Sequence, residues 1–225
     1  MNQKKTAGEK AVEFISDGMT VGLGTGSTVY YTIHKVAELI KSGMKLQCVS
    51  TSSSTTKLAQ SLGINLVSLN DVDKIDVTID GADEVDYNLN GIKGGGGALL
   101  FEKLVAKNSV KNIWVVDSSK LVNQLGKFPL PVEVVQFALK NLFKKFNDLG
   151  YNPEFRMQGN EHYLTDSHNK IIDLHINKIE HPGVLEKSIK EITGVVECGL
   201  FIGIADVIIV GTESGIKQIN KDREL

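Results

Sequence analysis

In the first 120 residues, short apolar runs alternate with segments of helical periodicity, and this alternation restricts the fold more than any other feature. The apolar runs that we expect to be strands are residues 19–24, 45–51, 64–69, 74–80 and 111–117. Segments with an apolar residue every three or four positions are expected to be helices. A first helix ends at residue 15, before the SDG sequence at 16–18, and three more occupy 29–40, 53–63 and 98–108. Strands that alternate with helices in this way predict a parallel sheet covered on its faces.

The pattern changes after the prolines of GKFPLPVEVV. The elements predicted beyond it are a helix over 135–149, strands over 162–166 and 170–176, a helix over 184–193, and strands over 195–201 and 206–212. Short strands joined by tight turns indicate a small antiparallel α+β unit inserted into the parallel domain, with the C-terminal tail returning to the first sheet. We therefore expect an α/β protein with one domain formed by 1–130 and 203–225, and a second formed by 131–202.

The composition excludes several classes of protein. A chain of 225 residues with 41% hydrophobic side chains can bury a real core, and its formal net charge of -2 offers no basic field for nucleic acid. No run approaches the roughly 18 apolar residues of a membrane span. Cys48 and Cys198 lack any C-x-x-C spacing, so we expect buried, reduced thiols. These features favour a cytoplasmic protein without a nucleic-acid or membrane partner.

The segment GLGTGST, residues 22–28, lies between a predicted strand and a predicted helix. Its backbone amides, its hydroxyls and the positive end of the helix would together form an anion site, for which phosphate is the obvious ligand. The spacing is neither a dinucleotide fingerprint nor a Walker motif. A simple tight turn with Ser27 as the helix N-cap is the alternative.

The stretch DGADEVDYNLNG, residues 80–91, is strongly acidic. Asp80 ends a predicted parallel strand, at the sheet edge where ligands bind in open α/β folds, and Asp83 can face the same cleft. The segment from Asp86 onward matches half of a calcium-binding loop, but position twelve falls on Gly97, where a glutamate is required. We interpret DYNLNG as a turn, and a solvated loop is the alternative for the two aspartates.

The run KGGGGALLFEK, residues 93–103, joins this loop to a helix. Four ordered glycines cost about 2–4 kcal/mol relative to alanines, so a flexible linker is the ordinary interpretation. Glycine also lets a backbone approach a ligand closely, and Glu102 falls in the first turn of the helix, beside amides that could stabilise an oxyanion. Glu102 is therefore an acid–base candidate, although most helix glutamates are merely exposed.

The histidines show no metal-ligand spacing, so we expect no metal site. A phosphate-binding loop, carboxylates, a lysine and donor amides are instead what proton transfer through an enediolate requires. An aldose–ketose interconversion of a sugar phosphate can proceed by that route, without the metal-assisted hydride shift that is its alternative.

Five segments together carry a resemblance to a known family. GLGTGST, DGADEVD, KGGGGALLFEK, VVDSSK and LGKFPLPVEV resemble, in this order and spacing, the type A ribose-5-phosphate isomerases, and ADVIIVGTESGIK is similar to that family's ending. The resemblance implies interconversion of D-ribose 5-phosphate and D-ribulose 5-phosphate in the non-oxidative pentose phosphate pathway, without metal or organic cofactor. It also implies a Rossmann-like domain with a smaller inserted ferredoxin-like domain, in a homodimer or homotetramer.

The resemblance also implies roles for individual residues. Glu102 matches the general base, Lys93 the positive group beside the reacting oxygens, and Asp80 and Asp83 the acids that hold the sugar hydroxyls and assist ring opening. The residues matching substrate contacts are Thr25, Gly26, Ser27, Thr28, Gly81, Ala82, Gly94, Gly95, Gly96 and Lys120.

Two positions leave the match open. Lys4 matches an N-terminal phosphate lysine, but the neighbouring Lys5 makes that register uncertain. Phe101 stands where many members of the family place a polar or basic residue, which alters the helix surface but not the chemistry.

Two other kinds of function are alternatives. A non-catalytic sugar-phosphate sensor would need a DNA-binding element, for which one short helix before residue 19 leaves no room. An acyl-CoA transferase or a glucosamine-phosphate isomerase/deaminase could use the same architecture, but neither accounts for the full set of motifs.

Overall fold

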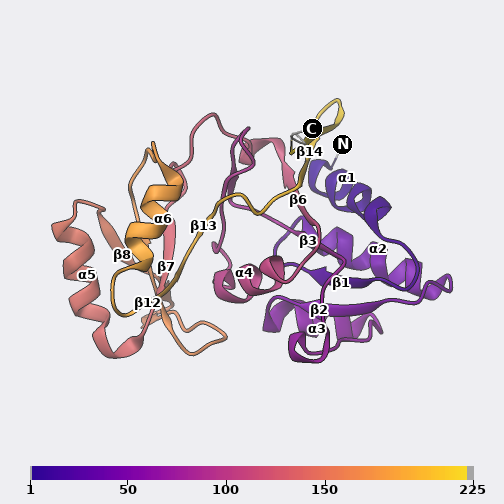
Figure 1. The fold of residues 1–225 in the computed structure, drawn as a ribbon, viewed down its shortest axis with the longest axis horizontal. Helices are drawn as coiled ribbons and strands as arrows, with labels where there is room; N and C mark the ends of the chain where they lie inside the picture. Colours follow the sequence, from indigo (N-terminus) through magenta and orange to yellow (C-terminus); the bar gives the residue numbers. More distant parts are fainter. Residues whose placement is uncertain (1, 222–225) are drawn as a thin grey trace.

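The computed structural model describes residues 2–221, which form two units lying side by side (Figure 1). The larger unit contains a six-stranded sheet in the order β15-β14-β6-β3-β1-β2. Its strands are β1 (Thr20–Leu23), β2 (Gln47–Ser50), β3 (Val77–Asp80), β6 (Asn112–Asp117), β14 (Val207–Thr212) and β15 (Gly215–Asn220). All neighbours pair in parallel except β14 and β15, so the sheet is essentially the predicted one.

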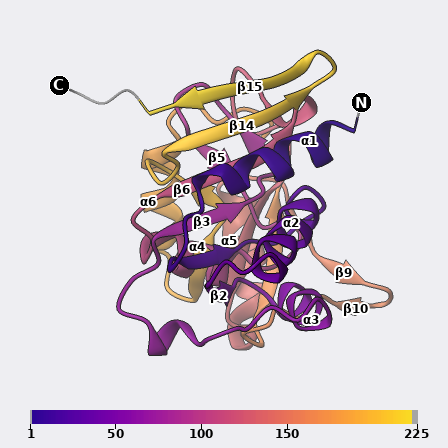
Figure 2. The same ribbon diagram turned by 90° about the vertical axis from the view of Figure 1, so that its right-hand side faces the viewer.

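The helices of this unit lie on both faces of the sheet. They are α1 (Gln3–Lys10), α2 (Val29–Lys41), α3 (Ser53–Ser61) and α4 (Leu99–Lys107). Figure 2 shows α1 and α2 on one face, while α4 lies on the other, between the sheet and the second unit (Figure 1). The buried faces of α1 and α2 pack against apolar residues of β1, β3, β6 and β14 in one core cluster.

The strand order creates a crevice at one point of the sheet edge. The chain leaves β1 for β2 on one side and reaches β3 on the other, so the order reverses between β1 and β3. Loops that follow these two strands therefore diverge to opposite faces, and the space between them is where ligands bind in doubly wound folds. Residues 24–28 and 81–83 are the segments that the sequence places there.

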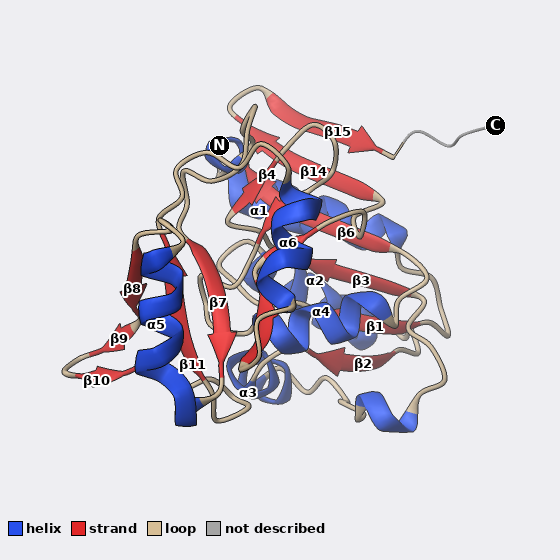
Figure 3. Ribbon diagram, turned by 60° about the vertical axis from the view of Figure 1, so that its left-hand side comes forward, coloured by secondary structure: helices blue, strands red, loops and turns tan. Residues whose placement is uncertain are grey.

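The second unit has the succession β-α-β-β-α-β. Its elements are β7 (Leu130–Val134), α5 (Leu139–Asp148), β8 (Pro153–Phe155), β11 (Lys170–Leu174), α6 (Pro182–Lys190) and β12 (Val195–Cys198). The sheet order β12-β7-β11-β8 is antiparallel throughout, which is the ferredoxin-like arrangement, and α5 and α6 pack against it (Figure 3). The predicted fold class is therefore confirmed, whereas the domain boundaries at 130/131 and 202/203 stay a prediction.

Two smaller sheets complete the fold. The three-stranded sheet contains β4 (Glu84–Val85), β5 (Gly91–Ile92) and β13 (Leu200–Phe201). Between β4 and β5 the predicted turn is confirmed, because Asp86 Oδ1 accepts hydrogen bonds from the amides of Asn88 and Asn90. The ribbon of β9 (Met157–Gln158) and β10 (Glu161–His162) extends from the second unit toward α3 (Figure 2).

Three strand predictions were wrong in part. Residues 64–69 pair with β2 only through the bridge at Leu66, because Ser68 instead caps the 3₁₀ turn Leu69–Asp71. Of 162–166 only His162 is in a strand, since the Thr165 hydroxyl accepts from the Asn169 amide in a turn. The predicted strand 195–201 is divided at Gly199 between two sheets.

The predicted helix over 135–149 begins late. Residues 136–138 form a 3₁₀ turn, and α5 starts only at Leu139. The segment before it is β7, which pairs with both β11 and β12 at the centre of its sheet. This strand was not predicted because Pro131 lacks an N–H and therefore argues against a central strand. Its carbonyl nevertheless accepts a hydrogen bond from the Gly199 amide at 2.7 Å.

Both cysteines are free and buried, as predicted. Burial raises the pKa of the Cys48 thiol to about 12 and that of Cys198 to about 11, so neither is a ready nucleophile. Within residues 2–221, no helix has the length and apolar character needed to cross a membrane.

Candidate active site

A cleft of about 150 Å³ opens where the strand order of the large sheet reverses. The residues that line it are Lys4, Thr25, Gly26, Ser27, Thr28, Gly81, Ala82, Asp83, Lys93, Gly94, Gly96, Glu102, Asp117 and Lys120. The structure thus brings together all of the predicted site residues except Asp80, which is buried behind this wall, and Gly95, which is exposed but does not line the cleft. These residues come from five separate segments of the chain, and the topology of the sheet explains why they meet.

The loop between β1 and α2 leaves its amides available. Thr28 occupies the N-cap position of α2 but its side chain makes no capping bond, so the alternative of Ser27 as N-cap is wrong. Among residues 2–221, no partner accepts from the amides of Gly26, Ser27 or Thr28. Free N–H groups at the positive end of a helix form a site for an anion.

Lys4 adds a charge to this loop. Its Nζ donates to Ser27 Oγ at 2.9 Å and lines the cleft, whereas Lys5 lies 3.9 Å from Glu9 on the exposed side of α1. Of the two lysines that the sequence could not distinguish, Lys4 is therefore the one beside the loop.

A group of hydroxyls holds Thr25 from behind. Its Oγ1 lies 2.8 Å from both Thr51 Oγ1 and Ser52 Oγ, and Thr55 Oγ1 donates to the Gly24 carbonyl at 2.8 Å. The sequence indicated only a capped helix for SSTTK, because hydroxyls that meet across two loops leave no local pattern.

Asp80 has a different position from the one expected. Its carboxylate is 1% exposed and does not line the cleft. Oδ1 accepts from the amides of Thr25 at 2.9 Å and Gly81 at 2.7 Å, and Oδ2 lies 3.0 Å from Lys93 Nζ. A Cβ on Gly24 would lie 2.1 Å from Oδ1, so glycine is required for this close approach. Asp80 thus joins the two loops and balances a buried cation.

Asp83 faces the cleft and connects its two walls. Its Oδ2 accepts from the Gly95 amide at 2.7 Å, which ties the DGAD loop to the glycine run. A Cβ on Gly95 would approach Asp83 Oδ1 to 2.5 Å. The glycine run is therefore ordered by specific contacts, and the alternative of a flexible linker is wrong.

Lys93 and Glu102 form a buried ion pair at the floor of the cleft. Lys93 Nζ lies 3.3 Å from Glu102 Oε1 and donates to the Gly81 carbonyl, and the two residues are 2% and 4% exposed. Glu102 Oε2 is buried, and no group within residues 2–221 hydrogen-bonds to it. One carboxylate oxygen is therefore held by the lysine while the other is without a partner.

The burial of this pair changes its acid–base properties. Burial raises the pKa of Glu102 to about 8; Lys93 opposes this shift, and the nearby Asp80 and Asp83 add to it. Burial alone would lower the pKa of Lys93, but Asp80 and Glu102 outweigh it and hold that pKa above its ordinary value. A carboxylate poised near neutral pH beside a persistent cation suits proton transfer at a carbon next to a carbonyl.

Asp117 and Lys120 also line the cleft. Asp117 ends β6 and accepts from the Ser119 amide at 3.0 Å, which starts the 3₁₀ turn Ser118–Lys120. Sequence reasoning missed Asp117, although its place at the end of a parallel strand is the same signal that indicated Asp80.

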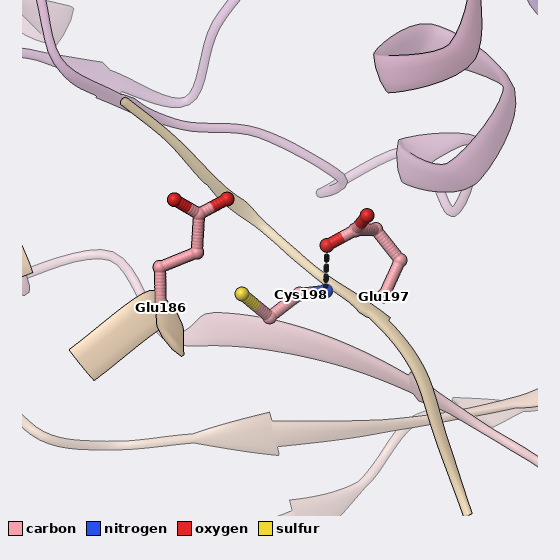
Figure 4. Close-up of side chains that lie close together, drawn as sticks. All are labelled: Glu186, Glu197 and Cys198. Carbon is pink, nitrogen blue, oxygen red and sulfur yellow. Dashed lines mark hydrogen bonds between the residues drawn. The ribbon is translucent and has the colours of Figure 1, made fainter. Parts of the chain in front are cut away.

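One other group of side chains has the composition of a metal site. Glu186, Glu197 and Cys198 gather where α6 meets β12, and Figure 4 shows Glu197 accepting from the Cys198 amide. The ammonium of Lys103 already donates to Glu197 at 2.8 Å and to Glu186 at 2.9 Å. It also donates to the carbonyls of Cys198 and Leu200, so a lysine serves as the cation of this group.

Fold and site together define a doubly wound α/β enzyme whose cleft combines an anion-binding loop with a buried acid–base pair. The family model of ribose 5-phosphate isomerase A (phosphoriboisomerase A) matches residues 47–215. Ribose-5-phosphate isomerase A of Streptococcus pneumoniae is 51% identical over 99% of both chains. That of Streptococcus thermophilus is 53% identical over 96% of both.

Solved structures agree with these sequence matches. A D-ribose-5-phosphate isomerase in complex with phospho-erythronic acid is 41% identical with a TM-score of 0.94, covering 98% of this chain and 100% of that one. Ribose 5-phosphate isomerase A of Neisseria gonorrhoeae is 45% identical with a TM-score of 0.91, covering 98% and 97%. The chain therefore belongs to the ribose-5-phosphate isomerase A family, as its motifs predicted.

Proposed function

We propose that this protein interconverts D-ribose 5-phosphate and D-ribulose 5-phosphate, in the non-oxidative pentose phosphate pathway, by proton transfer through an enediolate. The observation that carries the proposal is Glu102, a buried carboxylate with a pKa raised to about 8 and one oxygen without a partner at the floor of a polar cleft. Membership of the family supports the same substrate pair.

The phosphate group is proposed to bind the loop between β1 and α2. The free amides of residues 26–28, the hydroxyls of Thr25, Ser27 and Thr28, and the ammonium of Lys4 support this assignment. A solved relative is in complex with phospho-erythronic acid, which combines a phosphate with a carboxylate and hydroxyls. The sugar would then extend toward Asp83, the glycine run and Lys120, which line the rest of the cleft.

The chemical step needs one base and no external oxidant. In the open-chain aldose, Glu102 takes the proton from C2, and the electrons of that C–H bond form the C1–C2 double bond of the enediolate. The same carboxyl group returns the proton to C1, while the hydroxyl proton of O2 ends on O1. One base that reaches both carbons is therefore sufficient, and the route needs no metal.

The surroundings of Glu102 supply the electrostatic stabilisation. Negative charge develops on the substrate oxygens as the carboxylate becomes neutral, and the Lys93 ammonium, which lines the cleft beside Glu102, is placed to stabilise that oxygen charge. Asp80 balances Lys93 when the cleft is empty and orients the amides of Thr25 and Gly81. Asp83, at the cleft surface, is the better placed acid for contact with sugar hydroxyls and for ring opening.

Location and assembly are part of the same proposal. The absence of a membrane-spanning helix in residues 2–221 and two buried free thiols support a cytoplasmic enzyme. A homodimer or homotetramer is expected, and the fully exposed ring of Phe137 is an apolar group that an interface could cover. Light scattering of the purified protein would measure the assembly state.

The proposal is tested by incubating EDTA-treated protein with ribose 5-phosphate and following ribulose 5-phosphate formation. We expect full turnover in the presence of EDTA. No ketose product from the folded protein would contradict the function, and activity that returns only on adding a divalent metal would contradict the metal-free route.

A further inference from the structure

The glycine run of the cleft, residues 94–97, is held by side chains from the second unit. Arg156, between β8 and β9, donates from Nη1 to the carbonyl of Gly94 at 2.6 Å and to that of Gly95 at 3.2 Å. The hydroxyl of Tyr163 donates to the Gly96 carbonyl at 3.3 Å. Three successive carbonyls are therefore turned toward one side, although none of these donors lines the cleft.

Arg156 is itself rigidly placed. Its guanidinium pairs with both oxygens of Asp173 on β11, with Nε 2.8 Å from Oδ2, and the two side chains are 13% and 17% exposed. Its amide donates to the Ile171 carbonyl, and its carbonyl accepts from the Tyr163 amide. Because the side chain and the backbone of Arg156 are both fixed by these bonds, its guanidinium loses little further conformational freedom when it binds the glycine carbonyls.

The carbonyl contacts determine where the amides point. No cis peptide bond occurs in residues 2–221, so each carbonyl and the following N–H point to opposite sides of the chain. The Gly94 carbonyl accepts from Arg156, and the next amide, that of Gly95, indeed donates to Asp83 on the cleft side. The Gly95 carbonyl also accepts from Arg156, so the Gly96 amide is turned away from the arginine.

The Gly96 amide has no acceptor among residues 2–221, and Gly96 lines the cleft. A Cβ on Gly96 would meet nothing closer than 3.7 Å, so this residue leaves space beside its own N–H. An unpaired donor that faces open space in the cleft is suited to an oxygen of the ligand.

We propose that Arg156, held by Asp173, is a positioning residue that keeps the Gly95–Gly96 peptide turned so that the Gly96 N–H binds the substrate oxygen that becomes negative in the enediolate. This inference rests on the proposed function and adds a contribution of the inserted unit to the chemical step. Arg156 does not line the cleft, so we expect its loss to act through the Gly96 amide, on the step in which charge develops.

The test compares Arg156→Gln, Arg156→Lys and Asp173→Asn with wild type. We expect kcat for ribose 5-phosphate to fall about 10- to 100-fold in Arg156→Gln, with KM within about threefold, because a displaced donor weakens mainly the transition state. The lysine variant keeps the charge without the fork and should recover part of the loss. The affinity for phospho-erythronic acid, whose planar carboxylate resembles the enediolate, should fall along with kcat/KM, while the affinity for inorganic phosphate is unchanged.

Glu154→Gln is the matched control, since Glu154 pairs with Asp173 in the sheet, and within residues 2–221 the one side chain that its exposed carboxylate bonds is that of His175. It should leave kcat and both affinities within twofold of wild type. A folded Arg156→Gln or Asp173→Asn variant with wild-type kcat would overturn the inference, as would equal losses of phosphate and phospho-erythronic acid affinity. An inactive wild type would instead refute the proposed function, so the two failures are distinguishable.

Discussion

Glu102 combines two properties that oppose each other in water: it is almost fully buried, and it must become charged to act as a base. Burial favours its neutral form, while the Lys93 ammonium 3.3 Å away favours its charged form. The balance places its pKa at about 8, so a proton can be taken up and released with little driving force at physiological pH.

The first prediction concerns the side chain itself. Glu102→Gln keeps the shape but cannot accept a proton, so we expect kcat/KM to fall about 10²- to 10⁴-fold or more with the thermal midpoint little changed. Glu38→Gln, which alters an exposed glutamate paired with Lys35, is the control and should retain wild-type activity. More than a tenth of wild-type turnover in Glu102→Gln would show that another group is the base.

The second prediction concerns pH. Only the ionised carboxylate can take the C2 proton, so kcat/KM should rise with pH through the Glu102 pKa of about 8 and level off above it. The apparent value belongs to the coupled Glu102–Lys93 pair, and the second ionisation of the substrate phosphate, near 6, is well separated from it. Initial rates between pH 6 and 10 measure the profile. A rate that is flat or falling between pH 7 and 9 is the contrary result.

At the scale of elements, helix α4 is attached to the second unit by Lys103, the residue that immediately follows Glu102. Lys103 is 2% exposed and joins this helix to Glu197 and to the carbonyls on either side of Gly199. The Gly199 carbonyl in turn accepts from the Lys93 amide at 2.9 Å, so the same short segment contacts Lys93 directly and the residue that follows Glu102 in α4. A Cβ on Gly199 would lie 2.3 Å from the Lys93 carbonyl, which is why no other residue fits.

The third prediction follows from this attachment. Burial would raise the pKa of Glu197, but the charge of Lys103 outweighs it and lowers that pKa, so the carboxylate is ionised and depends on the lysine. Lys103→Met should reduce the free energy of unfolding by about 3–5 kcal/mol, because it leaves a buried charge without its main partner. Urea denaturation measures the loss.

Lys107→Met, on the exposed side of α4, is the control and should change the unfolding free energy by less than about 0.5 kcal/mol. The double variant Lys103→Met/Glu197→Gln should lose less than Lys103→Met alone, since it also removes the buried carboxylate, whose remaining cationic partner would be the half-exposed Lys190. Equal losses in the single and double variants would mean that packing of the lysine stem, and not its charge, stabilises this contact.

At the scale of the molecule, the cleft is assembled from segments that are distant in sequence. Lys4 reaches Ser27 from α1, on the face of the sheet opposite α4, while Arg156 reaches Gly94 across 62 positions. The Asp166 carboxylate accepts from the Ser53 amide at the start of α3, which links the inserted unit to the far side of the cleft. The site is therefore a property of both units together.

The fourth prediction uses two adjacent lysines. Lys4→Ala removes a cation from the proposed phosphate site and should raise KM for ribose 5-phosphate about tenfold or more, as expected for the loss of a charge-assisted contact. Lys5→Ala removes the same side chain from the exposed face of α1 and should leave KM unchanged. The reverse result, or equal effects, would place the phosphate elsewhere.

The sequence determined by itself the features that depend on local pattern. The apolar runs predict the parallel strands, and the ends of those strands place the glycine loop, Asp80 and Asp83 at one edge, because parallel strands share their carboxyl end. The fold class and half of the cleft residues, at 25–28 and 81–83, follow from these features. The strand at 130–134 was missed, and the turn before residue 170 was expected only after Asp166 although it begins at Thr165, because proline and side-chain hydrogen bonds there override the local propensities.

Only the tertiary structure decided the features that depend on what surrounds a group. It distinguishes Lys4 from Lys5, buries Asp80 behind the cleft wall and brings Arg156 against the glycine carbonyls. The raised pKa of Glu102 belongs to the same class, because desolvation and the charges of Lys93, Asp80 and Asp83 act through space. Sequence identifies which residues can do chemistry, but distances across the fold decide how each one behaves.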